Sequence, residues 1–185
     1  MQALFVFVFK LLKILIVISV LLVPKISCSQ SNNDSINTVL LDSLEYGLSD
    51  SLYSFNNSNI KIIPPRYFVT LPNDVMGFIH NSSASSIQIS EIKNTAYFMV
   101  TKGLDSVYFE NQKLKLVSKN DVVTNDGKKG TYFLIKFKVQ EIEFERIMFF
   151  TGDYNRTIWI NANYPALGHD TLFNVLLSSI LTVKF

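Results

Sequence analysis

The fold class follows most directly from three successive stretches, TYFLIKFKVQ at residues 131–140, EIEFERIMFF at 141–150 and TIWINANY at 157–164. Apolar and polar residues alternate along the first and third stretches, a pattern typical of strands with one face turned to a core. The apolar positions of these two strands are Phe133, Ile135, Phe137, Val139, Ile158, Ile160, Ala162 and Tyr164. Because short turns join the three stretches, we expect them to form adjacent antiparallel strands.

Turn signals flank these stretches. Asn125-Asp126-Gly127 comes before the first and predicts a β-hairpin, and residues 152–155 predict the turn before the third. Inside the second stretch the apolar positions change phase at Arg146, which predicts a β-bulge at Glu145-Arg146.

Weaker patterns predict the elements before and after this sheet. We expect a short strand at residues 60–63, mostly loop at 66–84 and a second strand at 86–92. A helix should begin at Asn94 or Thr95 and end near residue 111, and a last helix should span 171–183.

Both faces of the expected sheet carry large apolar side chains. From the alternation we expect Trp159, Tyr132 and Leu134 to lie on the face opposite to the apolar positions named above. Both faces therefore need a cover, and the two helices can provide one each. The sequence predicts an α+β fold, a three-layer α-β-α sandwich with a mainly antiparallel central sheet.

The charge of the chain is concentrated near its start. Of 17 Lys and Arg against 15 Asp and Glu, the basic residues Lys10, Lys13 and Lys25 lie in residues 1–29, which contain no acid. The remainder has 14 basic and 15 acidic side chains, which excludes a nucleic-acid binder that works by bulk positive charge. A hydrophobic content of 48% excludes a disordered chain.

The beginning of the chain has the pattern of a secretory signal. Basic residues precede an apolar run, and small residues at Ser27 and Ser29 favour cleavage after residue 29. We therefore expect a signal peptide at 1–29, a polar linker with a marginal helix at 30–59, a domain at 60–185, and a secreted or periplasmic protein. The alternatives are a membrane anchor formed by residues 4–23 and a lipoprotein modified at Cys28. Because Cys28 is the sole cysteine, a disulfide scaffold and a thiolate zinc site are excluded.

Several short motifs, in this order, resemble the PsbP-like family. They are Ile62-Ile63-Pro64-Pro65, Phe68, Gly77-Phe78, Ser85-Ser86-Ile87-Gln88-Ile89-Ser90-Glu91-Ile92, Leu116-Val117-Ser118-Lys119, Phe149-Phe150-Thr151-Gly152-Asp153, Thr157-Ile158-Trp159-Ile160, Tyr164-Pro165 and Leu176-Leu177-Ser178-Ser179-Ile180. The resemblance covers about residues 60–185 and implies an α-β-α sandwich without a shared catalytic centre. It also implies a binding role, since well-understood members are a lumenal photosystem subunit and a nuclear import factor that binds the Ran GTPase. Neither partner is implied here, because no residues that would carry those interactions are found.

Histidines and carboxylates are the candidates for catalytic chemistry. His169 precedes Asp170, which could orient its imidazole, but a solvated helix start capped by Asp170 explains the pair as well. Glu141, Glu143 and Glu145 should share one strand face with Arg146 nearby. Paired carboxylates can hydrolyse glycosides, but we favour a solvated row that pairs with lysines across the hairpin.

No motif specifies a catalytic residue, a metal ligand or a cofactor, so we expect none of the three. We expect an exported, non-enzymatic protein that binds another envelope or secreted protein, with no nucleic acid as partner and no membrane contact unless the signal segment is retained. The alternatives are a binder of a small ligand or polysaccharide, with a cleft near residues 66–84, and a hydrolase. The expected partner contacts are Phe68, Phe78, His80 and Trp159. Trp159 could instead be buried under a helix layer, as could Tyr154 and Tyr164.

Overall fold

The computed structural model describes residues 46–56, 58–72 and 75–185. The expected signal peptide, its two alternatives and most of the expected linker lie outside the described residues. The described part of the linker contains no helix. Instead, β1 (Tyr53–Ser54) pairs with β2 (Lys61–Ile62) in a two-stranded sheet, and Leu48 forms a β-bridge with Pro65.

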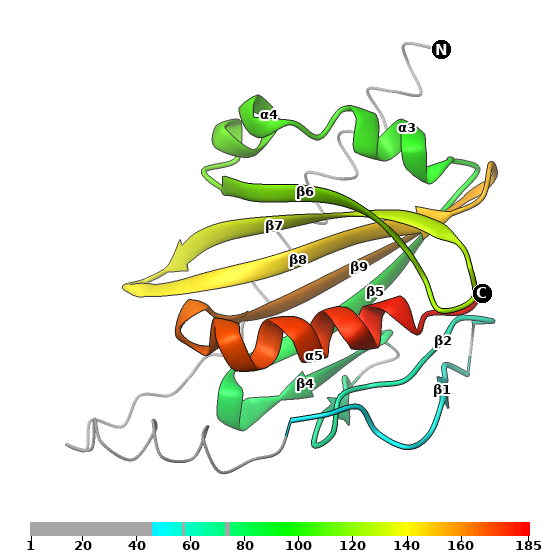
Figure 1. Cartoon of the computed structure of the whole chain (residues 1–185), viewed down its shortest axis with the longest axis horizontal. Coiled ribbons are helices and arrows are strands. Elements are labelled where there is room, and N and C mark those ends of the chain that lie inside the picture. The colour runs from blue at the N-terminus through cyan, green and yellow to red at the C-terminus, as the bar shows by residue number, and fades with distance from the viewer. Residues whose placement is uncertain (1–45, 57, 73–74) are drawn as a thin grey trace. The chain divides into compact units, whose positions relative to one another are not determined.

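The main sheet has seven strands in the order β3-β4-β5-β9-β8-β7-β6, and every neighbouring pair is antiparallel (Figure 1). Its strands are β3 (Val69–Thr70), β4 (Gly77–His80), β5 (Ser85–Lys93), β6 (Lys115–Val123), β7 (Lys129–Val139), β8 (Ile142–Gly152) and β9 (Arg156–Pro165). The prediction of a mainly antiparallel sheet within an α+β fold is confirmed.

The long hairpins form where the turn signals predict them. Gly127 has a φ of 85° in the turn between β6 and β7, a left-handed conformation that glycine adopts without strain. The predicted bulge at Glu145-Arg146 is wrong, because β8 pairs with β7 and β9 in unbroken register. Both faces of this central strand are covered, so its buried residues need not alternate. The register shift lies in β6, between Leu116 and Ser118.

The segment expected to be loop at residues 66–84 contains β3, β4 and the short 3-10 helix η1 (Asn81–Ser83). Polar residues and turn signals conceal these strands in the sequence. Gly77 explains how β4 approaches β5: a Cβ atom at this position would lie 2.2 Å from the backbone oxygen of Ile87. Only glycine therefore fits where the two strands meet.

The helix expected from residue 94 to 111 forms instead as two short helices, α3 (Tyr97–Lys102) and α4 (Ser106–Asn111). Gly103 ends the first, and the side chain of Asp105 accepts a hydrogen bond of 2.8 Å from the backbone N–H of Tyr108 in the second. The capping side chain is thus Asp105, since neither Asn94 nor Thr95 caps α3, whose N-cap residue is Ala96.

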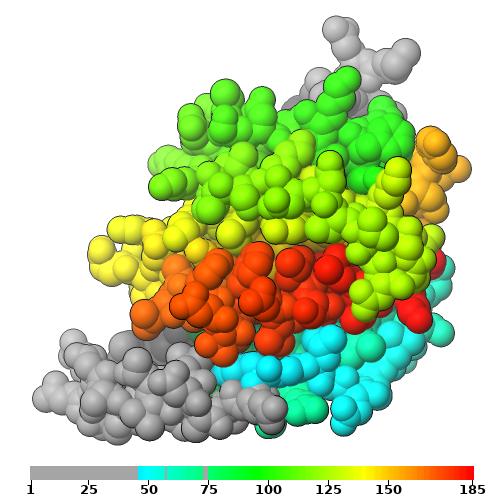
Figure 2. Space-filling model, in the orientation of Figure 1, coloured from blue at the N-terminus to red at the C-terminus, as the bar shows by residue number. Residues whose placement is uncertain are grey.

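The last helix is α5 (His169–Leu181), which follows the 3-10 helix η2 (Ala166–Gly168) directly and begins two residues before the predicted start. It packs against β8 and β9 through Leu172, Leu176 and Ile180. In Figure 2 its orange and red atoms lie between the yellow-green atoms of β6 and the cyan atoms of the first described residues.

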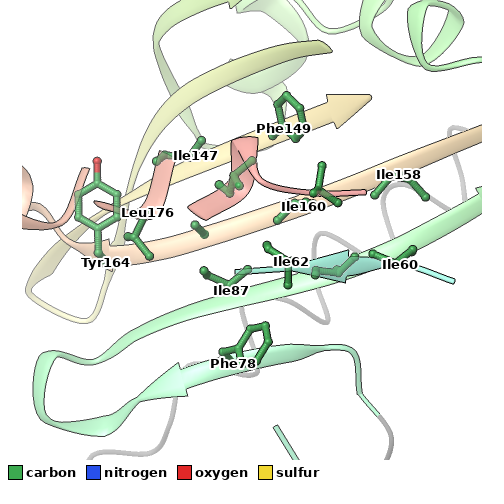
Figure 3. Packing of buried hydrophobic residues seen from close by; sticks show 14 of the residues in the cluster. Ile60, Ile62, Phe78, Ile87, Ile147, Phe149, Ile158, Ile160, Tyr164 and Leu176 are labelled. Atoms are coloured by element: carbon green, nitrogen blue, oxygen red, sulfur yellow. The ribbon is translucent and has the colours of Figure 1, made fainter. Parts of the chain in front are cut away.

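The core beneath α5 gathers side chains from strands that are far apart in sequence. The residues labelled in Figure 3 are Ile60, Ile62, Phe78, Ile87, Ile147, Phe149, Ile158, Ile160, Tyr164 and Leu176. Trp159 faces the opposite side of β9, where its ring stacks on Phe150 with 5.8 Å between ring centroids. The alternation predicted for residues 157–164 is confirmed. The expectation that Trp159 shares a face with Leu134 is wrong, because Leu134 packs in the core with Ile158 and Ile160, while Phe133 lies on the face of Phe150 and Trp159.

Candidate binding site

Three of the four expected partner contacts are buried. Trp159 is only 1% exposed, and its indole N–H donates a hydrogen bond of 3.0 Å to Oδ1 of Asn161. Phe78 is likewise buried, against the rings of Tyr53 and Phe55. Apolar rings at these positions fill the core of the domain, so neither reaches a partner in this fold.

His80 belongs to a small internal cluster with Phe68. Its Nδ1 lies 2.7 Å from Oγ of Ser83, and its ring stacks on half-buried Phe68 with 5.5 Å between centroids. The edge of Tyr46 completes the cluster. Burial lowers the pKa of His80, so the neutral ring is favoured. These contacts give His80 and Phe68 a packing role.

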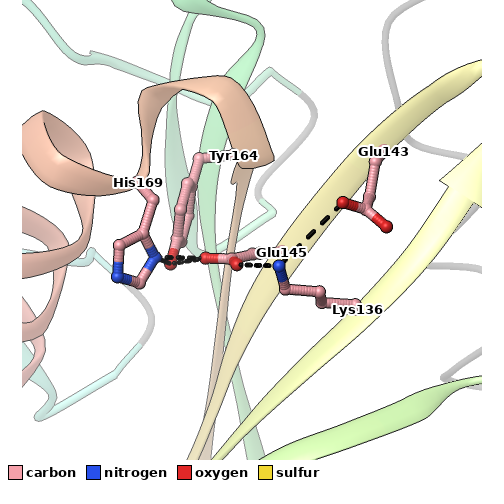
Figure 4. A network of polar contacts seen from close by, with 5 residues as sticks. All are labelled: Lys136, Glu143, Glu145, Tyr164 and His169. Atoms are coloured by element: carbon pink, nitrogen blue, oxygen red, sulfur yellow. Dashed lines mark hydrogen bonds and ion pairs between the residues drawn. The ribbon is translucent and has the colours of Figure 1, made fainter.

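Glu145 and His169, which belong to separate sequence motifs, lie in contact in the structure. Glu145 receives a hydrogen bond of 2.7 Å from the hydroxyl of Tyr164, and Nδ1 of His169 lies 2.5 Å from the same carboxylate oxygen (Figure 4). Nζ of Lys136 lies 3.1 Å from the other oxygen and 3.9 Å from Glu143. The strand register explains this meeting, because Glu145 pairs with Lys136 on β7 and with Tyr164 on β9.

The expected row of solvated carboxylates is therefore wrong in part. The side chain of Glu145 is 3% exposed, while that of Glu143 remains half exposed, and Glu141 lies in the turn before β8. Arg146 points to the other face of the strand, where its Nε donates a hydrogen bond of 2.6 Å to Asn163 and its guanidinium lies over the ring of Phe137.

The electrostatics of this network favour an ionised Glu145. Burial raises the pKa of its carboxyl, but hydrogen bonds from Tyr164, His169 and Lys136 outweigh burial and hold that pKa below its usual value. Burial, followed by the bond to Glu145, raises the pKa of Tyr164 and keeps its hydroxyl protonated. In the described part of the chain, no serine, threonine or cysteine hydrogen-bonds to His169, so the network holds no activated nucleophile of that kind.

A groove of about 520 Å³ lies between α3, the end of β6 and the start of β7. Its lining residues are Tyr97, Phe98, Thr101, Lys102, Lys119, Asp121, Val122, Val123, Lys129, Gly130 and Thr131. Lys102, Lys119 and Lys129 are exposed, and none of them forms an ion pair with another described residue. Asp121, the acidic residue of the lining, accepts a hydrogen bond of 2.7 Å from the hydroxyl of Thr131.

Exposed apolar side chains border this groove. Phe98 is 48% exposed and contacts the ring of Tyr154, which is 81% exposed, with 5.9 Å between centroids. Met99, next to Phe98 on α3, and Val123, in the lining, are exposed as well. Of the aromatic residues considered for a surface patch, Tyr154 is the one that lies outside, while Trp159 and Tyr164 are buried.

The groove was missed at the level of sequence because its three lysines come from three elements. Lys102 ends α3, Lys119 lies in β6, and Lys129 begins β7. The available signal was Phe98-Met99, two adjacent apolar residues that lie off the core face of the expected helix.

Two further findings concern the described residues as a whole. None of their helices has both the length and the apolar character needed to cross a bilayer. Nor do residues 46–56, 58–72 and 75–185 bring together three or more His, Cys, Asp or Glu side chains in a group that could hold a metal ion.

Solved structures that resemble this chain include the following three, all of low sequence identity. Cyanobacterial PsbP (CyanoP) from Synechocystis matches with a TM-score of 0.53 and 10% identity, over 72% of this chain and 91% of that one. A protein from Bacteroides thetaiotaomicron matches with a TM-score of 0.47 and 15% identity, over 68% of this chain and 44% of that one. A Pseudomonas aeruginosa protein of unknown function matches with a TM-score of 0.41 and 12% identity, over 72% of this chain and 95% of that one.

No protein-family model and no curated protein matches the chain. At such low identity, likeness to a solved structure establishes the fold alone. The match to cyanobacterial PsbP covers most of that protein, and the motifs from Ile62 to Ile180 resemble the same family. The domain therefore has a PsbP-like fold.

Proposed function

We propose that this protein is exported and binds another envelope or secreted protein without turning over a substrate. The observation that carries the proposal is the exposed pair Phe98 and Tyr154 beside a groove with three exposed lysines. Rigid aromatic side chains contribute strongly to binding energy at protein interfaces, and adjoining exposed apolar groups often mark such interfaces.

The surface proposed here differs from the one expected from the sequence. Residues 66–84 supply strands and buried rings, whereas α3 and the turn after β8 present their aromatic side chains outward. The turn joins the central strands β8 and β9, and α3 packs against the same two strands, so a rigid antiparallel sheet can hold this binding surface in place.

Export is supported by the pattern of residues 1–29 and by the likeness to cyanobacterial PsbP. We propose that cleavage after residue 29 releases the mature protein outside the cytoplasm. The finer architecture is part of the same proposal: α5 covers one face of the sheet and α3 with α4 covers the other, as in a three-layer α-β-α sandwich.

Site-specific photocrosslinking in the organism that makes this protein tests the proposal. A photoreactive phenylalanine analogue replaces Phe98 in the full chain, and in a control strain it replaces Leu167, which is 87% exposed in η2. We expect a discrete adduct with a second protein at position 98 and a much weaker one at 167. Cell fractionation should find both variants outside the cytoplasm.

Three results would contradict the proposed function. Equal adducts at the two positions would show that exposure alone causes crosslinking. An adduct with a carbohydrate or small molecule in place of a protein would favour the ligand-binding alternative, which the volume of the groove also fits. Retention in the cytoplasm would refute export.

A further inference from the structure

Resting on the proposed function, we infer that the groove binds an extended acidic segment of the partner polypeptide. Carboxylates of that segment pair with Lys102, Lys119 and Lys129, and an apolar side chain of the segment packs against Phe98 and Val123. The segment lies alongside β6.

The net positive charge of the groove lining favours a negatively charged ligand. It contains three lysines against Asp121, whose carboxylate is already engaged by Thr131. The chain without residues 1–29 has 14 basic and 15 acidic side chains, so this positive charge is a local feature of the groove. Such a concentration of one sign steers a partner of the opposite sign and orients it.

The spacing of Lys119 and Lys129 matches the spacing of carboxylates along an extended peptide. Lys119 pairs with Phe133, and Lys129 lies four residues before Phe133 on the same strand. At ~3.3 Å per residue, the Cα atoms of Lys119 and Lys129 lie about 13 Å apart along the strand direction. Two carboxylates four residues apart in an extended peptide have the same separation, with one side chain between them on the same face.

The position of β6 favours an extended polypeptide in particular. Among the described strands, β6 lies at the edge of the sheet and pairs with β7 alone. An edge strand offers main-chain groups to an added strand, which is a common mode of peptide binding. Val123 pairs directly with Lys129, and together with Phe98 it gives the groove a place for an apolar side chain, which an acidic polysaccharide lacks.

A direct binding experiment tests this inference on the mature protein. The probe is a fluorescein-labelled ten-residue peptide in which Glu, Leu and Glu occupy alternate positions separated by Ser, and its control carries Gln in place of Glu. We expect fluorescence anisotropy to show saturable binding of the Glu peptide, at least tenfold weaker binding of the Gln peptide, and a loss of affinity as salt is raised.

Charge reversal locates the binding on the molecule. K119E/K129E should weaken binding of the Glu peptide at least tenfold, whereas K115E/K138E should change it less than twofold. Lys115 and Lys138 are exposed lysines of the same two strands, β6 and β7, but lie outside the groove. Circular dichroism should show equal melting temperatures for the two double variants, because all four side chains are exposed.

Several outcomes would overturn the inference. They are no binding of the Glu peptide at millimolar concentration, equal binding of the Glu and Gln peptides, and equal effects of the two double variants. Binding of polygalacturonate in place of the peptide, with dependence on Lys119 and Lys129, would make the partner a polysaccharide. If the peptide fails while the protein adduct at position 98 persists, the acidic segment is refuted and the proposed function stands.

Discussion

A carboxylate buried in a protein is costly unless hydrogen bonds and positive charge compensate for the lost water. Glu145 has both, since Tyr164 and His169 contact one of its oxygens and Lys136 contacts the other. The network joins β7, β8, β9 and the first residue of α5. We call this network the Glu145 clasp, because its hydrogen bonds and ion pair attach the start of α5 to the sheet.

Replacing this carboxylate should therefore reduce stability. We expect Glu145→Gln to lower the free energy of unfolding at neutral pH by about 2–3 kcal/mol. The neutral amide would no longer form the ion pair with Lys136, and it would accept weaker hydrogen bonds than the carboxylate does. Glu143→Gln is the control and should change it by no more than about 0.5 kcal/mol, since that side chain is half exposed and lies 3.9 Å from Lys136. Urea unfolding measures both changes. Equal losses of unfolding free energy in the two variants would show that the network around Glu145 does not stabilise the domain.

The same network predicts how the domain responds to acid. The pKa of Glu145 is held below its usual value of 4.5 in the folded state, so below about pH 4.5 the unfolded chain takes up the proton first. The stability that ionised Glu145 contributes is complete above that pH and is lost as the pH falls through the lowered pKa. Between about pH 5 and pH 3, wild-type protein should lose more unfolding free energy than Glu145→Gln. If unfolding free energy falls with pH equally in both proteins, Glu145 does not cause the acid loss.

His80 predicts a second loss in a different pH window. Burial lowers its pKa in the folded state from the usual value of 6.5, so the unfolded chain binds a proton more readily as the pH falls below 6.5. Stability should therefore decline from about pH 6.5 downward. His80→Asn keeps a polar atom near Ser83 but does not titrate, and its unfolding free energy should change less between pH 7 and about pH 5.5. An unchanged slope would show that His80 does not cause the decline.

At the scale of elements, the sequence predicted the parts that a local repeating pattern specifies. Alternation identified β7 and β9, and Asn125-Asp126-Gly127 identified the hairpin between β6 and β7. The strands β3 and β4 were missed because they are two and four residues long and depend on pairing with β5. Such short strands carry too few residues for a pattern, and tertiary contacts decide their state.

The candidate site was harder to predict than the fold, for the same reason. Alternation can tell which residues of one strand share a face, but the register between strands decides which lysines meet across the groove. Lys119 and α3 line the same groove, and α3 ends at Lys102, where Gly103 interrupts the longer helix that periodicity predicted. Glu145 and His169 likewise meet through the pairing of β8 with β9.

The contact between β4 and β5 gives a prediction at this scale. Gly77→Ala should lower the free energy of unfolding by about 2 kcal/mol or more, because the new Cβ would lie 2.2 Å from the backbone oxygen of Ile87. Gly47→Ala is the matched control, since its nearest neighbour would be the side chain of Arg66 at 4.0 Å. Thermal unfolding followed by circular dichroism compares the two. A tolerated Gly77→Ala would mean that β4 can shift away from β5.

For the whole molecule, the structure separates what stabilises the domain from what is proposed to bind. The core beneath α5 and the stacked rings of Phe150 and Trp159 hold the fold together. Phe98 and Tyr154 lie outside both, on the surface beside the groove. Exposed apolar side chains that contribute little to folding are free to serve recognition, so stability and binding should respond to different substitutions.

The double variant F98S/Y154S tests that separation. It should lower the melting temperature by no more than about 3 °C, because substitutions of exposed side chains change the unfolding free energy by only about 0.5 kcal/mol each. A photoreactive residue at Met99, also exposed on α3, should give a partner adduct in the otherwise unaltered protein and lose it in F98S/Y154S. V107S/I142S removes two exposed apolar side chains elsewhere, on α4 and at the start of β8, and should keep the adduct. If the adduct survives in F98S/Y154S, or disappears equally in V107S/I142S, these two aromatic residues do not anchor the partner. A large fall in melting temperature in F98S/Y154S would instead place them among the residues that hold the fold together.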